Sequence, residues 1–215
     1  MLITGASRGI GRAIAYKFAA QGANVLVGAR TISGYQKVVD KINENGGRAA
    51  GVLLDVTKEE QINETVDHII GSHGSIDVLI NCAGVIVYDS PTWLTTVEEW
   101  DNMMEVNVKG TFLCCRSVIP HMIDGSGGCI INMGSSSARM ADDEYGPYTA
   151  TKWAVAGYTA SLARSVRQYN IRVNGINPGW VDTDMARLFN PDGDPEWSTA
   201  EEIAEVALFL AASAP

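Results

Sequence analysis

A chain of 215 residues that is 46% hydrophobic and 19% charged can form one domain with a large buried core. Its net charge of -9 and its lack of any Lys/Arg run argue against nucleic acid and anionic membranes as partners. Because the sequence has neither a membrane-length apolar run nor a signal-peptide pattern, we expect a cytoplasmic protein.

The chain begins with the pattern of a strand, a glycine-rich turn and a helix. Met1–Thr4 is a short apolar strand, Gly5–Gly11 is the turn, and Arg12–Ala20 has helical apolar spacing. Glycines let the backbone approach a pyrophosphate closely, and a helix N-terminus directs free N–H groups at it. The glycines could instead serve tight packing alone, because their GxxxGxG spacing differs from the usual dinucleotide fingerprint.

The end of the second strand indicates which nucleotide is bound. Asn24–Arg30 is apolar enough to be covered on both faces. An acidic residue at its end would hold the ribose hydroxyls and repel a 2′-phosphate. This chain has Ala29 and Arg30 there, with Arg8 as a possible second cation, so we predict NADP(H) in preference to NAD(H). An ordinary surface arginine is the alternative.

Strands and helices continue to alternate along the chain, which is typical of a parallel sheet with right-handed crossovers. We therefore predict a single α/β domain over residues 1–215, a Rossmann-type doubly wound sheet of order 3-2-1-4-5-6 with helices on both faces. The remaining expected elements are helices over 34–45, 58–72, 96–122, 146 to beyond 163, and 199–212, and strands over 49–54, 76–80, 129–133 and 171–176.

Most of the notable residues fall at the carboxyl end of a strand, where such sheets bind ligands. Asp55 could meet an adenine after the third strand, although Asp55 or Thr57 could equally cap the next helix. Asn81–Gly84 follows the fourth strand, where small residues would let the backbone line a cofactor. Asn107 lies in apolar helical surroundings and needs a partner, with a satisfied core amide as the alternative.

Tyr148 and Lys152 form the most informative pair. Gly146-Pro147 marks a helix entrance, which places Tyr148 and Lys152 four residues apart on one helical face. A free phenol, with a pKa of about 10, is a poor acid at neutral pH. An ammonium one turn away and the positive end of the helix dipole both stabilise the phenolate. The alternative is an ordinary i,i+4 pair on a solvated face.

The four cysteines show no spacing typical of metal ligands, and adjacent Cys114 and Cys115 are poor candidates for a disulfide. We expect these two, together with Cys82 and Cys129, to be small buried hydrophobes in a reducing compartment. We predict no metal site.

Taken together, the motifs resemble those of the short-chain dehydrogenase/reductase family, close to the 3-oxoacyl-carrier-protein reductase type. The resemblance covers almost all of residues 1–212 and implies an oxidoreductase that interconverts a carbonyl and a secondary alcohol by hydride transfer. The motifs that carry it are Thr4–Gly11 (TGASRGIG), Asp55-Val56, Asn81–Gly84 (NCAG), Asn107, Ser135 thirteen residues before Tyr148, the Tyr148-x-x-x-Lys152 pair, and Pro178-Gly179.

The resemblance implies a catalytic tetrad of Asn107, Ser135, Tyr148 and Lys152. In that family Tyr148 would exchange a proton with the carbonyl oxygen, and Ser135 would hydrogen-bond the same oxygen. Lys152 would support the phenolate and hold the nicotinamide ribose, while Asn107 would anchor a water that relays protons to Lys152. The two serines that follow Ser135 compete for its role, but the spacing to Tyr148 favours Ser135.

The resemblance also implies a cofactor site built from the glycine turn and the strand ends. Its expected contact residues are Gly5, Ser7, Arg8, Gly9, Ile10, Gly11, Arg30, Asp55, Val56, Asn81, Ala83, Gly84, Tyr148, Lys152, Pro178, Gly179, Val181 and Thr183.

Three features depart from the family pattern. Cys82 stands where the family commonly has Asn, which weakens a local hydrogen bond but leaves backbone contacts possible. The first strand lacks several residues that usually precede the glycine turn. Because the sequence stops at Pro215, we also expect the usual C-terminal seventh strand, which helps form one oligomer interface, to be absent.

We expect a homodimer, with a tetramer possible. The helix that carries Tyr148 is apolar most of the way round, and the helical region before it has the same excess. Packing both helices against their symmetry copies would bury this surplus in a two-fold interface, which is also how the family dimerises. The residues that supply the excess in the earlier region are Met103, Met104, Val106, Phe112 and Leu113.

Two other functions remain open: a non-catalytic nucleotide-binding regulator on the same fold, and an isomerase or lyase that uses the tyrosine differently. The substrate is a small molecule that the sequence does not identify. The acidic run at residues 142–144 could disfavour anions or could be only a solvated loop. Candidates for lining the substrate pocket are Trp93, Met140, Tyr145, Trp180 and the segment 185–197, although apolar residues near a strand end are more often core.

Overall fold

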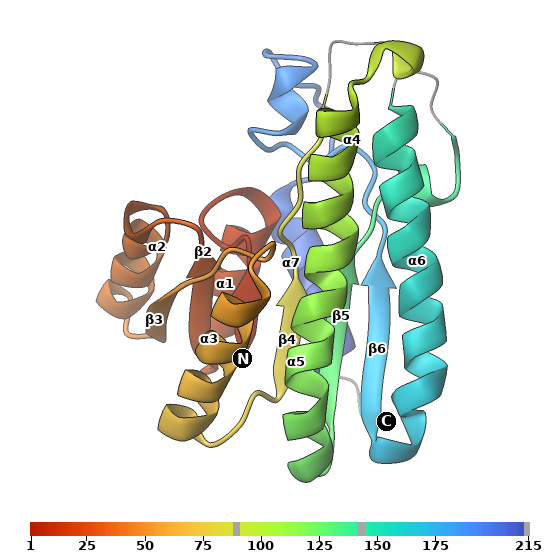
Figure 1. Ribbon diagram of the computed structural model, residues 1–215. Helices are drawn as coiled ribbons and strands as arrows, with labels where there is room; N and C mark the ends of the chain where they lie inside the picture. Colours follow the sequence, from red (N-terminus) through yellow and green to blue (C-terminus); the bar gives the residue numbers. More distant parts are fainter. Residues whose placement is uncertain (88–90, 142–144, 213–215) are drawn as a thin grey trace.

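The computed structural model describes residues 1–87, 91–141 and 145–212, and at its centre lies a six-stranded parallel sheet (Figure 1). The strand order is β3-β2-β1-β4-β5-β6, which confirms the predicted topology. The order reverses between β1 and β4, and doubly wound sheets bind ligands at such a reversal. The strands are β1 (Leu2–Thr4), β2 (Asn24–Ala29), β3 (Arg48–Leu53), β4 (Val78–Asn81), β5 (Gly128–Met133) and β6 (Ile171–Ile176).

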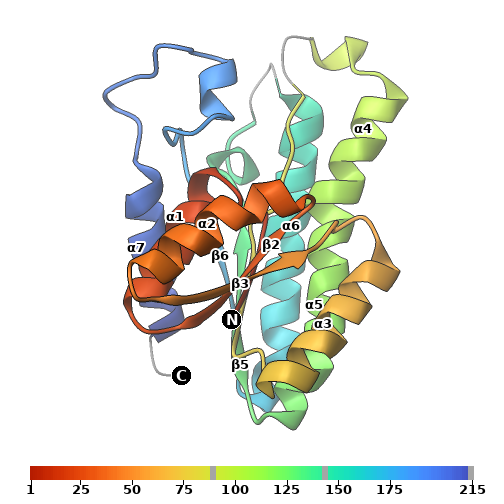
Figure 2. The ribbon, with the colours of Figure 1, turned by 90° about the vertical axis from the view of Figure 1, so that its left-hand side faces the viewer.

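Helices cover both faces of the sheet, so the molecule has three layers (Figure 2). The helices are α1 (Gly9–Ala20), α2 (Ile32–Glu44), α3 (Glu59–His73), α4 (Val97–Met103), α5 (Gly110–Asp124), α6 (Gly146–Val166) and α7 (Ala200–Ala212). Helices α1, α2 and α7 lie on one face, and α3, α5 and α6 lie on the other, with α4 continuing the column of α5.

Register in the central strands divides the core into two apolar clusters. Leu2 of β1 lies beside Leu79 of β4, and Leu79 lies beside Ile130 of β5, all three facing α3 and α5. The next residue along each strand faces α1 and α7, because side chains alternate between the faces of a sheet. Each fully buried aliphatic side chain contributes about 1.5–3 kcal/mol of hydrophobic stabilisation.

The helical region expected over residues 96–122 is not one continuous α-helix. Helix α4 starts at a capping box in which the Thr96 hydroxyl accepts from the Glu99 amide and the Glu99 carboxylate accepts from the Thr96 amide. Between α4 and α5, residues Met104–Lys109 form a π-helical segment. Such segments are rare in proteins, and those that occur are often found at functional sites. This one contains Asn107.

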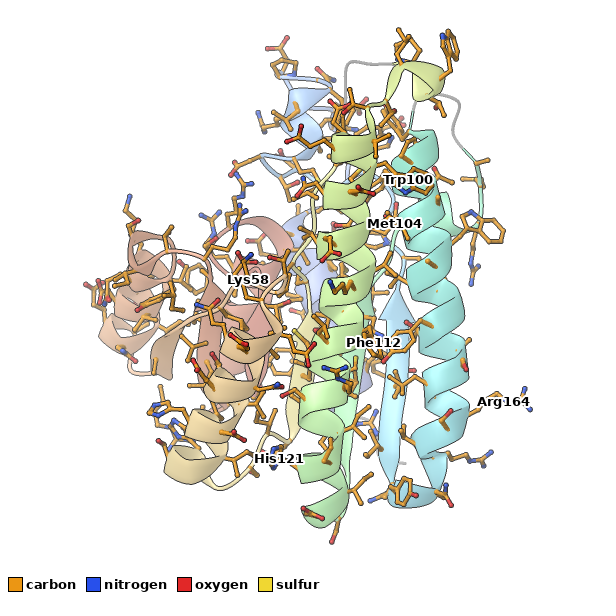
Figure 3. All side chains as sticks on the ribbon, viewed as in Figure 1. Lys58, Trp100, Met104, Phe112, His121 and Arg164 are labelled. Atoms are coloured by element: carbon orange, nitrogen blue, oxygen red, sulfur yellow. The ribbon has the colours of Figure 1, made fainter. Side chains whose placement is uncertain are left out.

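The five residues expected to supply surplus apolar surface in this region do not all do so, and the prediction was wrong for three of them. Met103, Val106 and Leu113 point toward the core. Of the five residues named in that prediction, Phe112, which is 39% exposed, and the half-buried Met104 retain apolar surface outside the core. Figure 3 shows both residues on the α4–α5 column beside α6.

The cysteines and the helices fit two further expectations. Cys114, Cys115 and Cys129 are buried free thiols, and Cys82 is partly buried. In the part of the chain that the structure describes, none of the helices combines the length and the apolarity needed to span a membrane.

Candidate active site

A cavity of about 310 Å³ runs along the carboxyl edge of the sheet. Every strand delivers part of its wall at the point where it ends, as expected for a doubly wound fold. The wall residues that follow the six strands in sheet order are Leu54–Val56 after β3, Ala29-Arg30 at the end of β2, Gly5 after β1, Cys82–Ile86 after β4, Met133–Ser137 after β5, and Pro178–Val181 after β6.

Two glycines of the turn occupy positions where a side chain would collide with neighbouring backbone. Gly5 has φ +64°, and a Cβ there would lie 2.7 Å from the Ala83 Cα. A Cβ on Gly11 would lie 2.6 Å from the Gly5 carbonyl oxygen. The start of α1 is therefore pressed against the ends of β1 and β4, and the turn's backbone lines the cavity.

Two features give the part of the cavity beside β1 and β2 a positive character. Helix α1 begins at Gly9 without a side-chain cap, since the Arg8 side chain makes no capping hydrogen bond, and its N-terminus lines the cavity. Arg30 also lines the cavity and is exposed, and it has no ion-pair or hydrogen-bond partner among the described residues. Arg8 pairs with Asp184 at 3.8 Å on the surface.

Asp55 both lines the cavity and closes a turn. Its Oδ1 accepts hydrogen bonds from the Thr57 amide at 3.0 Å and from the Thr57 hydroxyl at 2.8 Å. The position before helix α3 belongs to Lys58, which makes no capping bond, so neither Asp55 nor Thr57 is the helix cap. The neighbouring Val56 packs against Gly110, where a Cβ would approach a Val56 methyl to 2.7 Å.

Helix α6 carries the central pair, as predicted. Pro147 stands in its first turn, and Tyr148 and Lys152 both line the cavity. The Lys152 side chain is buried; its Nζ donates to the Met133 carbonyl at 2.9 Å and lies 5.4 Å from the Tyr148 ring centroid. The end of β5 therefore holds the ammonium beneath the phenol ring.

Ser135 lies two residues after the end of β5 and lines the same cavity. It occupies the position before a short 3₁₀ helix, Ser136–Ala138, and its Oγ accepts from the Ser137 amide at 3.2 Å. The two hydroxyls of Ser135 and Ser137 lie 3.2 Å apart. Ser136 and Ser137 line the cavity as well, so position alone does not choose among the three serines.

Asn107 lies behind the cavity wall rather than in it. Its Oδ1 accepts from the Val85 amide at 2.8 Å, and its Nδ2 donates to the Val85 carbonyl at 2.9 Å and to the Thr151 hydroxyl at 3.1 Å. A Cβ placed on Gly84 would lie 3.5 Å from the Asn107 Oδ1 and 3.9 Å from the Lys152 Nζ. The amide is thus a satisfied buried group that also flanks the lysine.

Asn81 is placed differently from the other expected cofactor contacts. It is not a wall residue, and its Nδ2 donates to Asn132 at 2.9 Å inside the sheet. The Asn132 amide in turn donates to the Thr159 hydroxyl of α6 at 2.9 Å, so Asn81 ties neighbouring strands to a helix. The wall does contain the remaining contacts, namely Gly5, Ser7, Arg8, Gly9, Ile10, Gly11, Arg30, Asp55, Val56, Ala83, Gly84, Tyr148, Lys152, Pro178, Gly179, Val181 and Thr183.

Some of the residues suggested for the substrate pocket lie in the cavity wall, and others do not. Tyr145, Trp180 and Met185 are wall residues. Trp93 is 81% exposed and Met140 is 69% exposed, and neither belongs to the wall, so these two suggestions were wrong. The acidic run at 142–144 lies outside the described residues.

Sequence reasoning missed the partners that hold the site residues. Val85 and Thr151 bind Asn107, and the Met133 carbonyl binds Lys152. Backbone groups act in three of these four bonds, because Val85 makes two with Asn107, and side-chain identity gives no signal for a backbone contact. Phe189, another wall residue, lay within a suggested segment without being singled out.

Cys82, where the family commonly has Asn, lies in the wall beside the lysine. Burial raises the pKa of its thiol to about 11, although Lys152 and a hydrogen bond with the Gly11 backbone act in the opposite direction. The backbone amides of Cys82 and Ala83 both donate to the Thr4 hydroxyl at 3.1 Å. The cysteine therefore leaves the backbone of this segment firmly held.

The fold and the cavity define a Rossmann-type protein whose ligand site lies at the carboxyl edge of its sheet. Residues 1–194 match the family model described as short chain dehydrogenase, and the chain belongs to this family of oxidoreductases.

Individual relatives support the same conclusion. The chain is 35% identical to the 3-oxoacyl-[acyl-carrier-protein] reductase FabG of Chlamydia muridarum, over 99% of this chain and 89% of that protein. Its structure is similar to a gluconate 5-dehydrogenase from Burkholderia cenocepacia in complex with NADP and tartrate, with TM-score 0.91, 30% identity, and coverage of 98% and 86%. A metagenomic short-chain oxidoreductase in complex with NADP gives TM-score 0.88, 33% identity, and coverage of 99% and 90%.

Proposed function

We propose that this protein is an NADP(H)-dependent oxidoreductase that interconverts a carbonyl and a secondary alcohol, with Tyr148 as general acid and base. The observation that carries the proposal is that Ser135, Tyr148 and Lys152 share one cavity with the glycine turn and Arg30. A reacting group and a dinucleotide could therefore lie together in one continuous site. We also propose that the chain works as one domain, since its described strands belong to one sheet.

The residues present fit a dinucleotide. The crowded glycines Gly5 and Gly11 bring backbone to the cavity surface, and the uncapped start of α1 offers amide groups to a pyrophosphate. Gly179 has no atom within 4 Å of the place where a Cβ would be, so the wall after β6 leaves open space. When bound, NADP(H) would supply or accept the hydride.

The chain's own groups account for the proton. Tyr148 donates its hydroxyl proton to the carbonyl oxygen during reduction and removes it during oxidation. Ser135 donates a hydrogen bond to the same oxygen and stabilises negative charge as it develops there. The Lys152 ammonium, fixed by the Met133 carbonyl, stabilises the phenolate that remains after proton transfer.

Asn107 has a supporting role in this proposal. Its Oδ1 and the Lys152 Nζ both lie close to Gly84, so a water between them could pass protons from solvent to the lysine. The π-helical segment aims the amide at this place, which agrees with the frequent use of such segments at functional sites.

NADP(H) is proposed over NAD(H) because of the end of β2. Arg30 has no partner among the described residues and stands next to the start of α2, whose first turn has no acidic residue. A ribose 2′-phosphate would meet positive charge there and no carboxylate from this strand. The two similar solved structures described above were also obtained in complex with NADP.

Loss of NADPH absorbance on mixing the protein with a panel of ketones tests the proposal, with the matching alcohols and NADP⁺ as the reverse assay. Turnover that disappears in Tyr148→Phe supports it. Tight NADPH binding without turnover on any ketone or alcohol would favour a nucleotide-binding regulator. Product formation without a change in cofactor oxidation state would favour an isomerase or lyase.

A further inference from the structure

Three aromatic side chains from separate segments line one part of the cavity, and one of them, Tyr145, stands three residues before Tyr148. We call this part the reacting end of the cavity. Tyr145 immediately precedes α6, Trp180 follows β6, and Phe189 follows the 3₁₀ helix Ala186–Leu188. The ring centroids of Tyr145 and Phe189 are 5.0 Å apart, those of Trp180 and Phe189 are 5.4 Å apart, and those of Tyr145 and Trp180 are 6.5 Å apart. All three pairs meet edge to face, the geometry that aromatic quadrupoles favour. We call these three residues the aromatic wall.

The Trp180 ring of the aromatic wall is held by a second tryptophan and by backbone hydrogen bonds. Trp197 stacks on Trp180 with an interplanar angle of 13° and a centroid distance of 5.4 Å, and it is not itself a cavity residue. The Ser198 amide donates to the Trp180 carbonyl at 3.1 Å, and the Asp182 amide donates to the Ser198 carbonyl at 2.9 Å. These backbone bonds join the two tryptophan segments, so a ligand would find the Trp180 ring already ordered.

Tyr145 is ordered by the same helix that carries the proposed acid. Its carbonyl accepts from the Thr149 amide at 2.7 Å in the first turn of α6, three residues before Tyr148. Tyr145 and Tyr148 are therefore positioned by one rigid element, whereas Trp180 and Phe189 reach the aromatic wall from other segments.

The described charges of the cavity lie elsewhere or have partners. Arg30 stands at the end of β2, and Arg8 pairs with Asp184. The Lys152 Nζ lies beneath the Tyr148 ring and donates to the Met133 carbonyl. Arg187, close in sequence to Phe189, is held by two bonds to Asp182 of 2.6 and 2.9 Å. Among the described wall residues, the reacting end thus offers rings but no unpaired cation for a substrate carboxylate.

We propose that the aromatic wall selects uncharged carbonyl compounds that carry an aromatic ring beside the carbonyl group, such as aryl ketones. The inference rests on the proposed function, because it places the substrate's carbonyl at Tyr148 and its ring against Trp180 and Phe189. An aromatic substituent can stack on or meet these rings edge to face. A saturated ring of the same size gains only apolar burial.

Three ketones test this selection. Acetophenone is the expected substrate; cyclohexyl methyl ketone has the same size and no aromatic face, and phenylglyoxylate adds a carboxylate beside the carbonyl. We expect kcat/KM for acetophenone to exceed that for the cyclohexyl compound by about three- to tenfold, the worth of one or two aromatic contacts. Phenylglyoxylate should be the poorest of the three. Equal values for phenyl and cyclohexyl, or a preference for phenylglyoxylate, would overturn the inference.

Binding without turnover separates this inference from the proposed function. Calorimetric titration of each ketone into the NADP⁺ complex measures affinity in a combination that cannot react. The same phenyl preference should appear in these dissociation constants. If the ketones are not reduced but the preference in binding persists, the proposed function fails and the aromatic selection stands. If reduction occurs with no preference in binding, only the selection fails.

Variants of the aromatic wall then test which residues cause the preference for the phenyl ketone. Trp180→Leu and Phe189→Leu should each reduce the phenyl preference to about twofold or less, whereas Trp180→Phe, which keeps a ring, should retain most of it. Trp93→Leu is the matched control, because Trp93 is exposed and outside the cavity wall. An unchanged preference in the soluble Trp180→Leu and Phe189→Leu proteins would overturn the assignment to the aromatic wall.

Discussion

At the scale of single residues, the Tyr148 hydroxyl is the only group assigned the transferred proton. Tyr148→Phe should therefore remove nearly all turnover while NADPH affinity stays within a few-fold, because the ring and its contact with Lys152 persist. Steady-state NADPH oxidation and fluorescence titration measure the two effects. Lys152→Ala should lower both turnover and cofactor affinity. Substantial ketone reduction by Tyr148→Phe would contradict the assignment.

A second prediction at this scale concerns the choice of cofactor. Wild type should bind NADPH more tightly than NADH, and Ala29→Asp with Arg30→Ile should reverse the order. A charge-assisted hydrogen bond to phosphate contributes roughly 1.5–3 kcal/mol, which is about ten- to a hundredfold in affinity. Fluorescence titration with both cofactors measures it. Lys41→Ile, which removes an exposed cation from the far end of α2, is the control and should leave the order unchanged.

The buried thiols predict how stability depends on pH. Burial raises the pKa of Cys82 to about 11 and that of Cys115 to about 12, and it raises that of Cys114 further. Unfolded thiols ionise first, so above their ordinary pKa of 9.0 the folded state binds more protons and the free energy of unfolding falls as pH rises.

Urea midpoints at about pH 8 and about pH 10 measure this fall. Cys114→Ala removes one of the raised thiols, so its midpoint should decrease less between the two values, even if the variant is less stable at both. A wild-type midpoint that does not change, or an equal decrease in the variant, would refute the role of the buried thiols.

At the scale of elements, the glycine turn makes the sharpest prediction. In Gly5→Ala, the new Cβ would lie 2.7 Å from backbone at Ala83, and the residue would keep φ +64°. We expect a loss of roughly 1–3 kcal/mol in the free energy of unfolding, together with weaker NADPH binding, because the wall itself must shift. Gly71→Ala in α3, where no atom lies within 4 Å, should instead be neutral or stabilising. Urea unfolding of both variants gives the comparison.

The elements also show what sequence reasoning can and cannot reach. Apolar runs ending in glycine or polar residues located all six strands, and Pro147 marked the start of α6. The π-helical segment Met104–Lys109 was missed, because one extra residue per turn leaves the apolar pattern nearly helical. Trp93 and Met140 were misplaced, since a loop's path depends on tertiary contacts that no local pattern records.

At the scale of the whole molecule, the outer surfaces of α4, α5 and α6 carry exposed apolar side chains. Trp100 is 42% exposed, Trp153 is 53% exposed, and Phe112 meets Tyr158 of α6 edge to face with centroids 6.1 Å apart. Figure 3 shows Trp100 and Phe112 along the α4–α5 column. A second copy packed across these helices would remove this surface from water.

We therefore predict a homodimer through α4, α5 and α6. Light scattering at micromolar concentration should give twice the mass of the chain, and Phe112→Asp should shift it toward monomer because a carboxylate would be buried at the interface. Phe209→Asp, on exposed α7 of the opposite layer, is the matched control and should leave the dimer intact. A monomeric wild type would contradict the prediction, and a stable tetramer would show that a further surface takes part.

The way the cavity draws on the chain has a consequence for synthesis. Most of the wall residues proposed to contact a cofactor lie within residues 5–84, whereas the residues proposed for the chemistry and the aromatic wall lie within residues 133–189. Because a chain leaves the ribosome from its N-terminus, the segments for the nucleotide are available well before those that would perform the chemistry. Most of the segments proposed to hold the cofactor would thus emerge first, and the later residues Tyr148, Lys152 and the wall after β6 would complete the cofactor site together with the groups proposed for the chemistry.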